Sequence, residues 1–154
     1  MSAELTVKKL KKFKLTISVA ESITGGGLGS AITDIAGSSE IFLGGVIAYS
    51  DEIKIKELGI SKALLKKHTA VSEEVAIEMA DSIRKKFKSD IGIATTGVAG
   101  PGRAYGQRAG TVWIAISSKN YTSAIPLLLA GGRTSIRQAT IDSAFALISR
   151  ILKA

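Results

Sequence analysis

The sequence predicts an α/β protein, a three-layer α/β/α sandwich built on a mixed β-sheet. Strand-like segments alternate with helical ones over about the first 90 residues, and two later strand-like segments follow each other across a short turn. Alternation favours parallel strands, whereas a short turn joins antiparallel ones, so the sheet is expected to be mixed. The 154 residues contain no Pro-rich or low-complexity linker. A single domain over 1–154 is therefore expected, since this length is close to the commonest domain size.

The first half of the chain supplies five of the expected elements. Apolar residues recur at helical spacing among five lysines at the N-terminus, and the next segment is a short apolar run typical of a buried strand. Ser50 and Asp51 have the chemistry of residues that cap the N-terminus of a helix. In chain order the elements are a helix over 1–14, a strand over 15–20, a helix over 28–36, a strand over 42–49 and a helix over 52–58.

The second half begins with the clearest helix signal. Ser72 opens a capping box, and the helix is expected to run to Lys88, whose basic surroundings suit the negative end of the helix dipole. A helix with an apolar stripe is expected to close the chain over 135–152. Between these helices, strands are expected over 91–95, 111–117 and 121–129, the last two as an antiparallel pair.

Composition excludes several classes of function. The chain has no cysteine, which excludes disulfides, thiolate catalysis and zinc–thiolate sites. The sole histidine, His68, lies in a basic, helix-like stretch, where a solvated surface residue is expected rather than a metal ligand or a member of a Ser-His-Asp triad. No apolar run approaches the roughly 18 to 20 residues that span a bilayer, and the N-terminal segment lacks the core of a signal peptide. A cytoplasmic location without a membrane partner is expected.

Charge favours anionic partners. The formal net charge is +8. From Ile91 onward the sequence contains seven Lys or Arg residues and a single acidic residue, Asp142. A generally basic surface explains this as well as a specific ligand does, because net charge governs association and solubility. Phosphorylated metabolites and nucleic acid both remain open at this point. The 5% aromatic content is low for a protein that stacks the bases of single-stranded nucleic acid.

Two glycine-rich segments follow strands, at the place where open α/β sheets bind ligands. After Ser22, the N–H groups near Gly25 to Gly27 are expected to bind an anion or a developing oxyanion; the alternative is a simple tight turn. The second segment, 95–102, leads into Arg103 and Arg108 and suits the gripping of a phosphate; the alternative is a surface connection.

A third feature places a phenol and an amine close together in sequence, Tyr49 and Lys54. They fall at the end of a strand and in the first turns of the following helix. The alternative reading is a half-buried tyrosine and a solvated lysine, because lysine is mostly exposed in folded proteins.

Together these segments resemble the nicotinamide mononucleotide deamidase family, which also occurs as the C-terminal domain of CinA proteins. The resemblance covers about residues 16–152. The matching stretches are 20–26, 35–39, Gly45, Tyr49-Ser50, Lys54, Gly59, 70–73, 96–101, 110–112, Gly132-Arg133 and Arg137. The resemblance implies hydrolysis of the carboxamide of nicotinamide mononucleotide to nicotinic acid mononucleotide and ammonia, in pyridine nucleotide salvage, without a metal or an organic cofactor. It also implies that Ser22, Tyr49 and Lys54 carry the chemistry.

Physical chemistry gives each of these three residues a role. A serine hydroxyl is a weak nucleophile that needs a base, and an unprotonated Lys54 would serve Ser22 in that way. Burial, nearby cations and the positive end of the helix would lower the Lys54 pKa, whereas Asp51 and Glu52 would raise it if they point inward. The sequence therefore leaves the direction of the pKa shift open. Tyr49 would relay the proton or donate a hydrogen bond to the departing ammonia.

The substrate is expected to contact both glycine-rich segments. The loop over 102–109 is short and basic, where the family usually carries an acidic or polar insertion, so its two arginines would strengthen phosphate binding. The expected substrate-binding residues are Glu21, Thr24, Gly25, Gly26, Thr96, Gly97, Ala99, Gly100, Pro101, Arg103 and Arg108.

Two other functions remain open. One is a noncatalytic protein that binds nucleotides, and the other is a basic module associated with nucleic acid. The joint presence of Ser22, Tyr49 and Lys54 favours the hydrolase, since a pure binding site does not require that trio. The low aromatic content and the absence of a nucleic-acid motif count against the third function. A small-molecule nucleotide is the expected partner, and a homo-oligomer is a further expectation.

Overall fold

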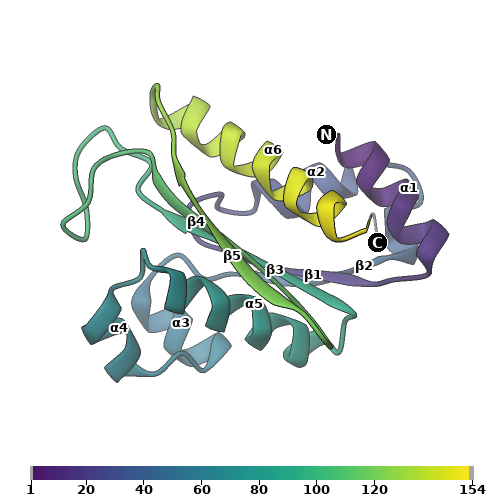
Figure 1. Cartoon of the computed structure of the whole chain (residues 1–154), viewed down its shortest axis with the longest axis horizontal. Helices are drawn as coiled ribbons and strands as arrows, with labels where there is room; N and C mark the ends of the chain where they lie inside the picture. Colours follow the sequence, from purple (N-terminus) through teal and green to yellow (C-terminus); the bar gives the residue numbers. More distant parts are fainter. Residues whose placement is uncertain (1, 153–154) are drawn as a thin grey trace.

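A mixed five-stranded β-sheet forms the middle layer of the protein (Figure 1). The computed structural model describes residues 2–152, so residues 1, 153 and 154 of the expected domain lie outside the described ones. The strand order is β2-β1-β3-β4-β5, with β1 parallel to β2 and β3, and β4 antiparallel to β3 and β5. The strands are β1 (Ile17–Glu21), β2 (Phe42–Ile47), β3 (Ile91–Gly97), β4 (Thr111–Ser118) and β5 (Thr122–Leu128).

Three helices cover each face of this sheet, which confirms the α/β/α sandwich (Figure 1). One layer contains α1 (Ala3–Phe13), α2 (Gly27–Thr33) and α6 (Arg133–Ile151). The other contains α3 (Asp51–Leu58), α4 (Lys62–His68) and α5 (Glu73–Phe87). A single 3₁₀ turn, Ser38–Glu40, precedes β2. Within residues 2–152, no helix combines the length and the apolar character needed to cross a bilayer.

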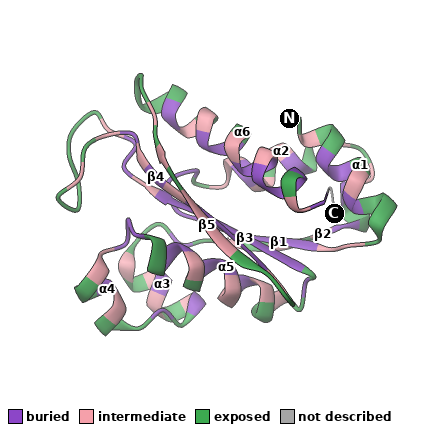
Figure 2. Ribbon diagram, viewed as in Figure 1, coloured by how far each residue is buried: buried purple, intermediate pink, exposed green. Residues whose placement is uncertain are grey.

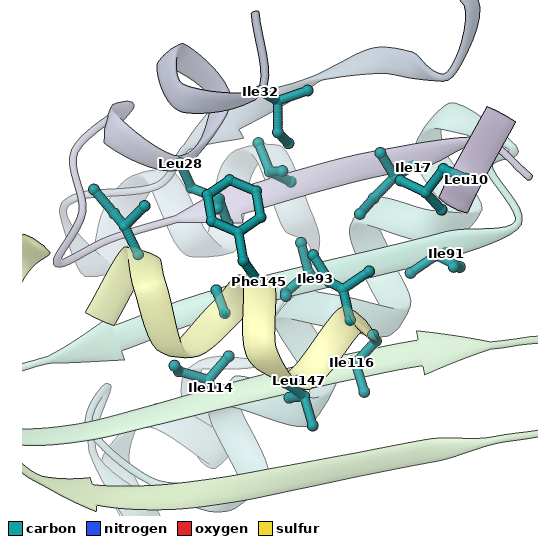
Figure 3. Packing of buried hydrophobic residues seen from close by; sticks show 14 of the residues in the cluster. Leu10, Ile17, Leu28, Ile32, Ile91, Ile93, Ile114, Ile116, Phe145 and Leu147 are labelled. Atoms are coloured by element: carbon teal, nitrogen blue, oxygen red, sulfur yellow. The ribbon is translucent and has the colours of Figure 1, made fainter. Parts of the chain in front are cut away.

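The two helical layers enclose two hydrophobic cores, one on each face of the sheet. In the first core, Phe145 and Leu147 of α6 pack toward Ile93 and Ile114 of the central strands (Figure 3). In the second, α5 packs on the other face, with Met79 fully buried. Buried residues follow the central strands and the inner helix faces, whereas exposed ones follow the outer faces and the long loop after β3 (Figure 2). Burial of apolar surface on both faces is the main stabilising term.

Element boundaries differ from the sequence pattern where tertiary contacts intervene. The helix expected over 28–36 ends at Thr33, and the strand expected over 42–49 ends at Ile47. Pairing with β1 continues for one residue beyond β2, through the Ala48 N–H to the Glu21 carbonyl at 2.7 Å. The chain then turns so that the Ser50 hydroxyl caps α3 by accepting from the Ile53 N–H. Tyr49 therefore lies in a turn rather than in the strand. The helix-like stretch around His68 is a short helix of its own, α4.

Candidate functional site

The carboxyl ends of β1 and β3 meet beside the turn after β2, and a cavity of about 290 Å³ opens there. Ligands of open α/β sheets bind at this edge because loops diverge from it. Within residues 2–152, no three His, Asp or Glu side chains come together as metal ligands. The cavity is lined by Ser22, Ile23, Tyr49, Gly97, Val98, Ala99, Gly100, Gly102, Arg103, Ala104, Tyr105 and Arg133.

Ser22 and Lys54 form a buried pair at the base of this site. The Lys54 Nζ lies 3.1 Å from the Ser22 Oγ and donates to the Ala48 carbonyl at 2.8 Å. Lys54 is 1% exposed and Ser22 is 8% exposed. The alternative of a solvated lysine is therefore wrong. Lys54 is the fourth residue of α3, whose start is capped by the Ser50 hydroxyl, and its amine reaches Ser22, the residue directly after β1.

The surroundings of Lys54 decide the direction of its pKa shift, which the sequence left open. Burial lowers the pKa of the Lys54 amine below its usual value, and the nearby Asp51 carboxylate only partly opposes this by raising it. Lys54 forms no ion pair with any residue in the described part of the chain. A larger share of neutral amine is therefore present than in a solvated lysine, and a neutral amine has the lone pair that a base needs.

Glu21, the last residue of β1, organises the turn that carries Ser22. Its carboxylate is 1% exposed and accepts from the Thr24 hydroxyl. It also accepts from the backbone N–H groups of Gly26 at 3.1 Å, Leu28 at 2.9 Å and Gly29 at 2.7 Å. A carboxylate with this many donors holds the start of α2 in one conformation. Glu21 therefore positions the turn that carries Ser22, and it does not line the cavity.

These bonds correct one expectation about anion binding. The Gly26 N–H is taken by Glu21, the Gly25 N–H donates to the Ser22 carbonyl at 3.1 Å, and the Gly27 N–H donates to the Thr24 carbonyl at 2.9 Å. The N–H groups of Gly25 to Gly27 therefore do not await an anion. A carboxylate inside the protein already satisfies the helix N-terminus. The Ile23 N–H, directly after Ser22, has no hydrogen-bond partner among residues 2–152.

Three further residues of the predicted substrate site are also used internally or lie off the cavity wall. The Thr24 hydroxyl is buried and bonds Thr95 at 2.7 Å. The buried Thr96 hydroxyl donates to the Ala70 carbonyl at 2.6 Å and so ties β3 to the segment before α5. Gly25 adopts the left-handed conformation (φ +56) and faces the Arg137 guanidinium. Like Glu21 and Gly26, these residues do not line the cavity.

The loop after β3 does line the cavity. Gly97, Ala99, Gly100 and Arg103 all contribute to its wall, as the sequence analysis expected. The backbone N–H groups of Ala99 and Gly100 have no hydrogen-bond partner within residues 2–152. Unpaired N–H groups beside an arginine suit a phosphate. Pro101 and Arg108 are exposed and stand off the cavity wall.

Arg133, which the sequence analysis left out of the site, joins two sides of the cavity. It is the first residue of α6, and its guanidinium donates to the Gly100 carbonyl at 2.7 Å and to the Tyr49 hydroxyl at 3.0 Å. Tyr49 is 58% exposed and has no hydrogen bond to Ser22 or Lys54. The Gly132-Arg133 pattern was the available sequence signal, but its partner in the site lies 84 residues away.

Arg137 and Tyr105 were also missed. Arg137 donates to the carbonyls of Ile23 at 3.2 Å and Thr24 at 2.8 Å, so α6 holds the turn that follows Ser22. Tyr105 lies on the loop over 102–109 and lines the cavity. The family pattern at Arg137 was the available sequence signal for that residue, whereas nothing in the local sequence around Tyr105 distinguishes it from an ordinary surface side chain.

The fold and the site thus define an α/β/α sandwich protein with a buried serine–lysine pair at the carboxyl edge of its sheet. Residues 1–152 match the model of the family described as "CinA C-terminal domain". The chain belongs to this family. A CinA-like protein from Kosmotoga olearia is 44% identical over 150 residues, which cover 97% of this chain and 36% of that protein. The chain spans little more than a third of the length of the curated relatives that it matches first.

Solved structures agree with this assignment. A competence-damaged protein (CinA) superfamily protein from Klebsiella pneumoniae is 30% identical with a TM-score of 0.96, over 98% of this chain and 95% of that one. A protein of the same superfamily from Escherichia coli is 31% identical with a TM-score of 0.94, over 97% of this chain and 87% of that one. The resemblance to this family and the mixed α/β fold are both confirmed.

Proposed function

We propose that this chain is an amidohydrolase that converts nicotinamide mononucleotide to nicotinic acid mononucleotide and ammonia. The observation that carries the proposal is the buried pair of Ser22 and Lys54, 3.1 Å apart, in which the amine lacks an acidic ion-pair partner among residues 2–152. A serine beside a lysine of lowered pKa is an activated nucleophile.

In the first half of the proposed reaction, the neutral Lys54 amine takes the Ser22 hydroxyl proton while Oγ attacks the carboxamide carbon. The resulting oxyanion lies close to the unpaired N–H of Ile23, the position that holds the oxyanion in many serine hydrolases. Lys54, now an ammonium, gives its proton to the carboxamide nitrogen. The carbon–nitrogen bond breaks, ammonia leaves, and an ester to Ser22 remains.

In the second half, water replaces ammonia. Lys54 takes a proton from the water, hydroxide adds to the ester carbon, and the Ser22 alkoxide leaves with the proton that Lys54 returns. The carboxylate product is released and the pair is restored. Tyr49 accepts a hydrogen bond from Arg133, so its own O–H is free to donate a hydrogen bond to the departing nitrogen, while the transferred proton comes from Lys54.

The residues of the cavity wall favour a phosphorylated substrate. Arg103 supplies a positive charge, and the Ala99 and Gly100 N–H groups have no partner within the described residues. The net charge of +8 favours approach of an anion. We therefore assign the substrate phosphate to the loop after β3.

A second candidate function is noncatalytic nucleotide binding. It is favoured by one observation, the hydrogen bonding of Tyr49 to Arg133 rather than to the serine–lysine pair. In that case the loop after β3 would hold a nucleotide whose amide is never cleaved.

Ammonia release from nicotinamide mononucleotide by purified protein tests the proposal. The comparison uses Ser22→Ala and a matched control, Ser30→Ala, which removes an exposed hydroxyl on α2. Turnover in the wild type and in Ser30→Ala that disappears in Ser22→Ala supports the hydrolase. Folded wild-type protein that binds the nucleotide without releasing ammonia would establish the noncatalytic function instead.

A further inference from the structure

The long loop between β3 and β4 contains a small hairpin that runs from Arg103 to Gln107. The loop extends beyond the end of the sheet (Figure 1). Ala104 and Gln107 exchange backbone hydrogen bonds of 3.0 and 2.9 Å and form an antiparallel bridge. Tyr105 and Gly106 between them both have positive φ values, as a two-residue hairpin turn requires. Arg103 donates to the Gly106 carbonyl at 2.9 Å, so the five residues form one compact unit.

The side chain of Gln107 attaches this hairpin to the rest of the protein. Its Nε2 donates to the Val71 carbonyl at 2.7 Å, and the side chain is half-buried. Within residues 2–152, this is the only hydrogen bond that joins residues 103–107 to a residue outside the loop. Gly100 and Gly102 precede the hairpin, and glycine restrains the backbone little. The position of the hairpin therefore depends on the contact between Gln107 and Val71.

Val71 gives this contact a fixed partner. It lies between α4 and α5 and is 2% exposed. The carbonyl of the preceding residue, Ala70, accepts from the Thr96 hydroxyl at 2.6 Å. The following residue, Ser72, caps α5 by accepting from the Val75 N–H. The segment is thus tied to the end of β3 and to the start of α5, so a group bonded to Val71 is held relative to the sheet.

The hairpin forms part of the cavity wall but not its base. Arg103, Ala104 and Tyr105 line the cavity. Ser22 and Lys54 lie at its base, and their side-chain hydrogen bonds involve each other and the Ala48 carbonyl rather than the hairpin. A shift of the hairpin would therefore change the wall and leave the serine–lysine pair in place. Substrate affinity should depend on the hairpin position, whereas bond breaking should not.

We propose that Gln107 is a positioning residue that anchors the 103–107 hairpin on Val71 and thereby holds Arg103 where it binds the substrate phosphate. The inference rests on the proposed function, since the phosphate is that of the same substrate. It goes further because it assigns substrate affinity to a residue that does not itself line the cavity.

Steady-state kinetics test this role. Gln107→Met keeps the length of the side chain and removes the donor to Val71. The KM for nicotinamide mononucleotide should rise about fivefold, the size of one side-chain hydrogen bond, while kcat stays within about twofold. Gln138→Met is the matched control, because it removes the hydrogen bond of an exposed glutamine to Asp142 on α6. It should change neither KM nor kcat.

A double-mutant cycle tests whether Gln107 acts through Arg103. Arg103→Ala should raise KM by itself. Gln107→Met should then raise KM little further, because the group that the anchor holds in place is gone. Fully additive effects of the two substitutions on KM would contradict action through Arg103.

Trypsin cleavage measures the anchor without any substrate. The bond after Arg103 lies in the anchored hairpin, so its cleavage in the native protein requires the hairpin to leave its position. Gln107→Met should be cut there about fivefold faster than the wild type, and Gln138→Met at the wild-type rate. Mass spectrometry identifies the cleaved bond, and circular dichroism verifies that each variant is folded.

An unchanged cleavage rate in Gln107→Met, or a fall in its kcat with KM unchanged, would overturn the proposal. Its failure is distinct from that of the proposed function. If the wild type releases no ammonia, calorimetric Kd values for nicotinamide mononucleotide replace KM in the same comparison, so the reaction fails while the anchor is still tested. Ammonia release with equal KM in the wild type and in Gln107→Met rejects only the anchor.

Discussion

Lys54 and Asp81 are ionisable residues on the same side of the sheet. The surroundings of Asp81 favour its charged form, whereas those of Lys54 disfavour it. Burial would raise the pKa of Asp81, but hydrogen bonds from Lys85, Arg84 and Ser117 outweigh it and hold the pKa below its usual value. The Asp81 carboxylate lies 3.0 Å from Arg84 and 3.1 Å from the Ser117 hydroxyl. Lys54 is more deeply buried and has only a hydroxyl and a carbonyl beside it.

The difference shows which charge the fold stabilises. At Asp81, cations and donors favour the charged form, so this cluster connects α5 to β4 and contributes to stability. At Lys54, burial without an acid in hydrogen-bond contact disfavours the charged form. Such an arrangement costs stability and is typical of groups that exchange protons in a reaction. The two regions should therefore respond to mutation in opposite ways.

Replacement of the amine should give the largest effect. Lys54→Met keeps an unbranched side chain that is one atom shorter and removes the base, so ammonia release should fall about 10³-fold. Thermal unfolding should show a midpoint that is unchanged or raised, because an apolar side chain avoids the cost of burying an amine. If Lys54→Met retained a tenth of the wild-type activity, this result would contradict the role of Lys54 as the base.

The pH dependence of stability provides a second test of the contrast between Lys54 and Asp81. The folded pKa of Lys54 lies below the unfolded value of 10.5, so the unfolded state binds more protons between the two. The free energy of unfolding therefore gains a contribution that rises with pH across this window. Lys54→Met should lose that contribution, and denaturant unfolding at several alkaline pH values measures it.

Glu21→Gln tests whether the turn after β1 needs a carboxylate. An amide offers one oxygen to four donors and brings two N–H groups of its own, so unfolding free energy should fall by on the order of 3 kcal/mol. Activity per folded molecule should fall too, since Ser22 loses its fixed position. Urea denaturation and kcat are the measurements, with Glu40→Gln on the exposed 3₁₀ turn as the control. Equal stability of the two variants would show that the carboxylate is dispensable.

The pH profile of ammonia release reports on the amine. Activity should rise with pH as Lys54 loses its proton, with the rise centred below 10.5 because burial lowers this pKa. Asp51→Asn removes the charge that raises the Lys54 pKa, so the rise should move to lower pH. Movement toward higher pH would contradict the assignment of Lys54 as the base.

Asp81→Asn should have the smallest effect, and on stability alone. Its partly exposed ion pairs contribute about 1 kcal/mol near neutral pH, and activity should be unchanged. Because the folded pKa of Asp81 is depressed, this contribution is present above the unfolded value of 3.8 and is lost as pH falls through the folded value. Denaturant unfolding at neutral and acidic pH should show the two proteins converging in acid.

Local sequence patterns predicted much of the fold. The capping box at Ser72 and the dipole-matched end near Lys88 correspond to α5, and the turn after β4 gives the antiparallel pair. The candidate site was harder to predict from the sequence. Gly97, Ala99, Gly100 and Arg103 line the cavity as expected, but Arg133 reaches it from a helix far along the chain. Sequence spacing does not encode which distant side chain shares a cavity.

The sequence by itself determined the mixed α/β fold, the family, and the residue types at the ends of the strands. Only the tertiary structure decided that Lys54 is buried against Ser22, 32 residues earlier in the chain. It also decided that Glu21 satisfies the helix N-terminus that seemed open to an anion. The physical reason is that burial and hydrogen-bond saturation depend on neighbours from other elements. Periodicity and capping depend on residues a few positions away, and a sequence displays them directly.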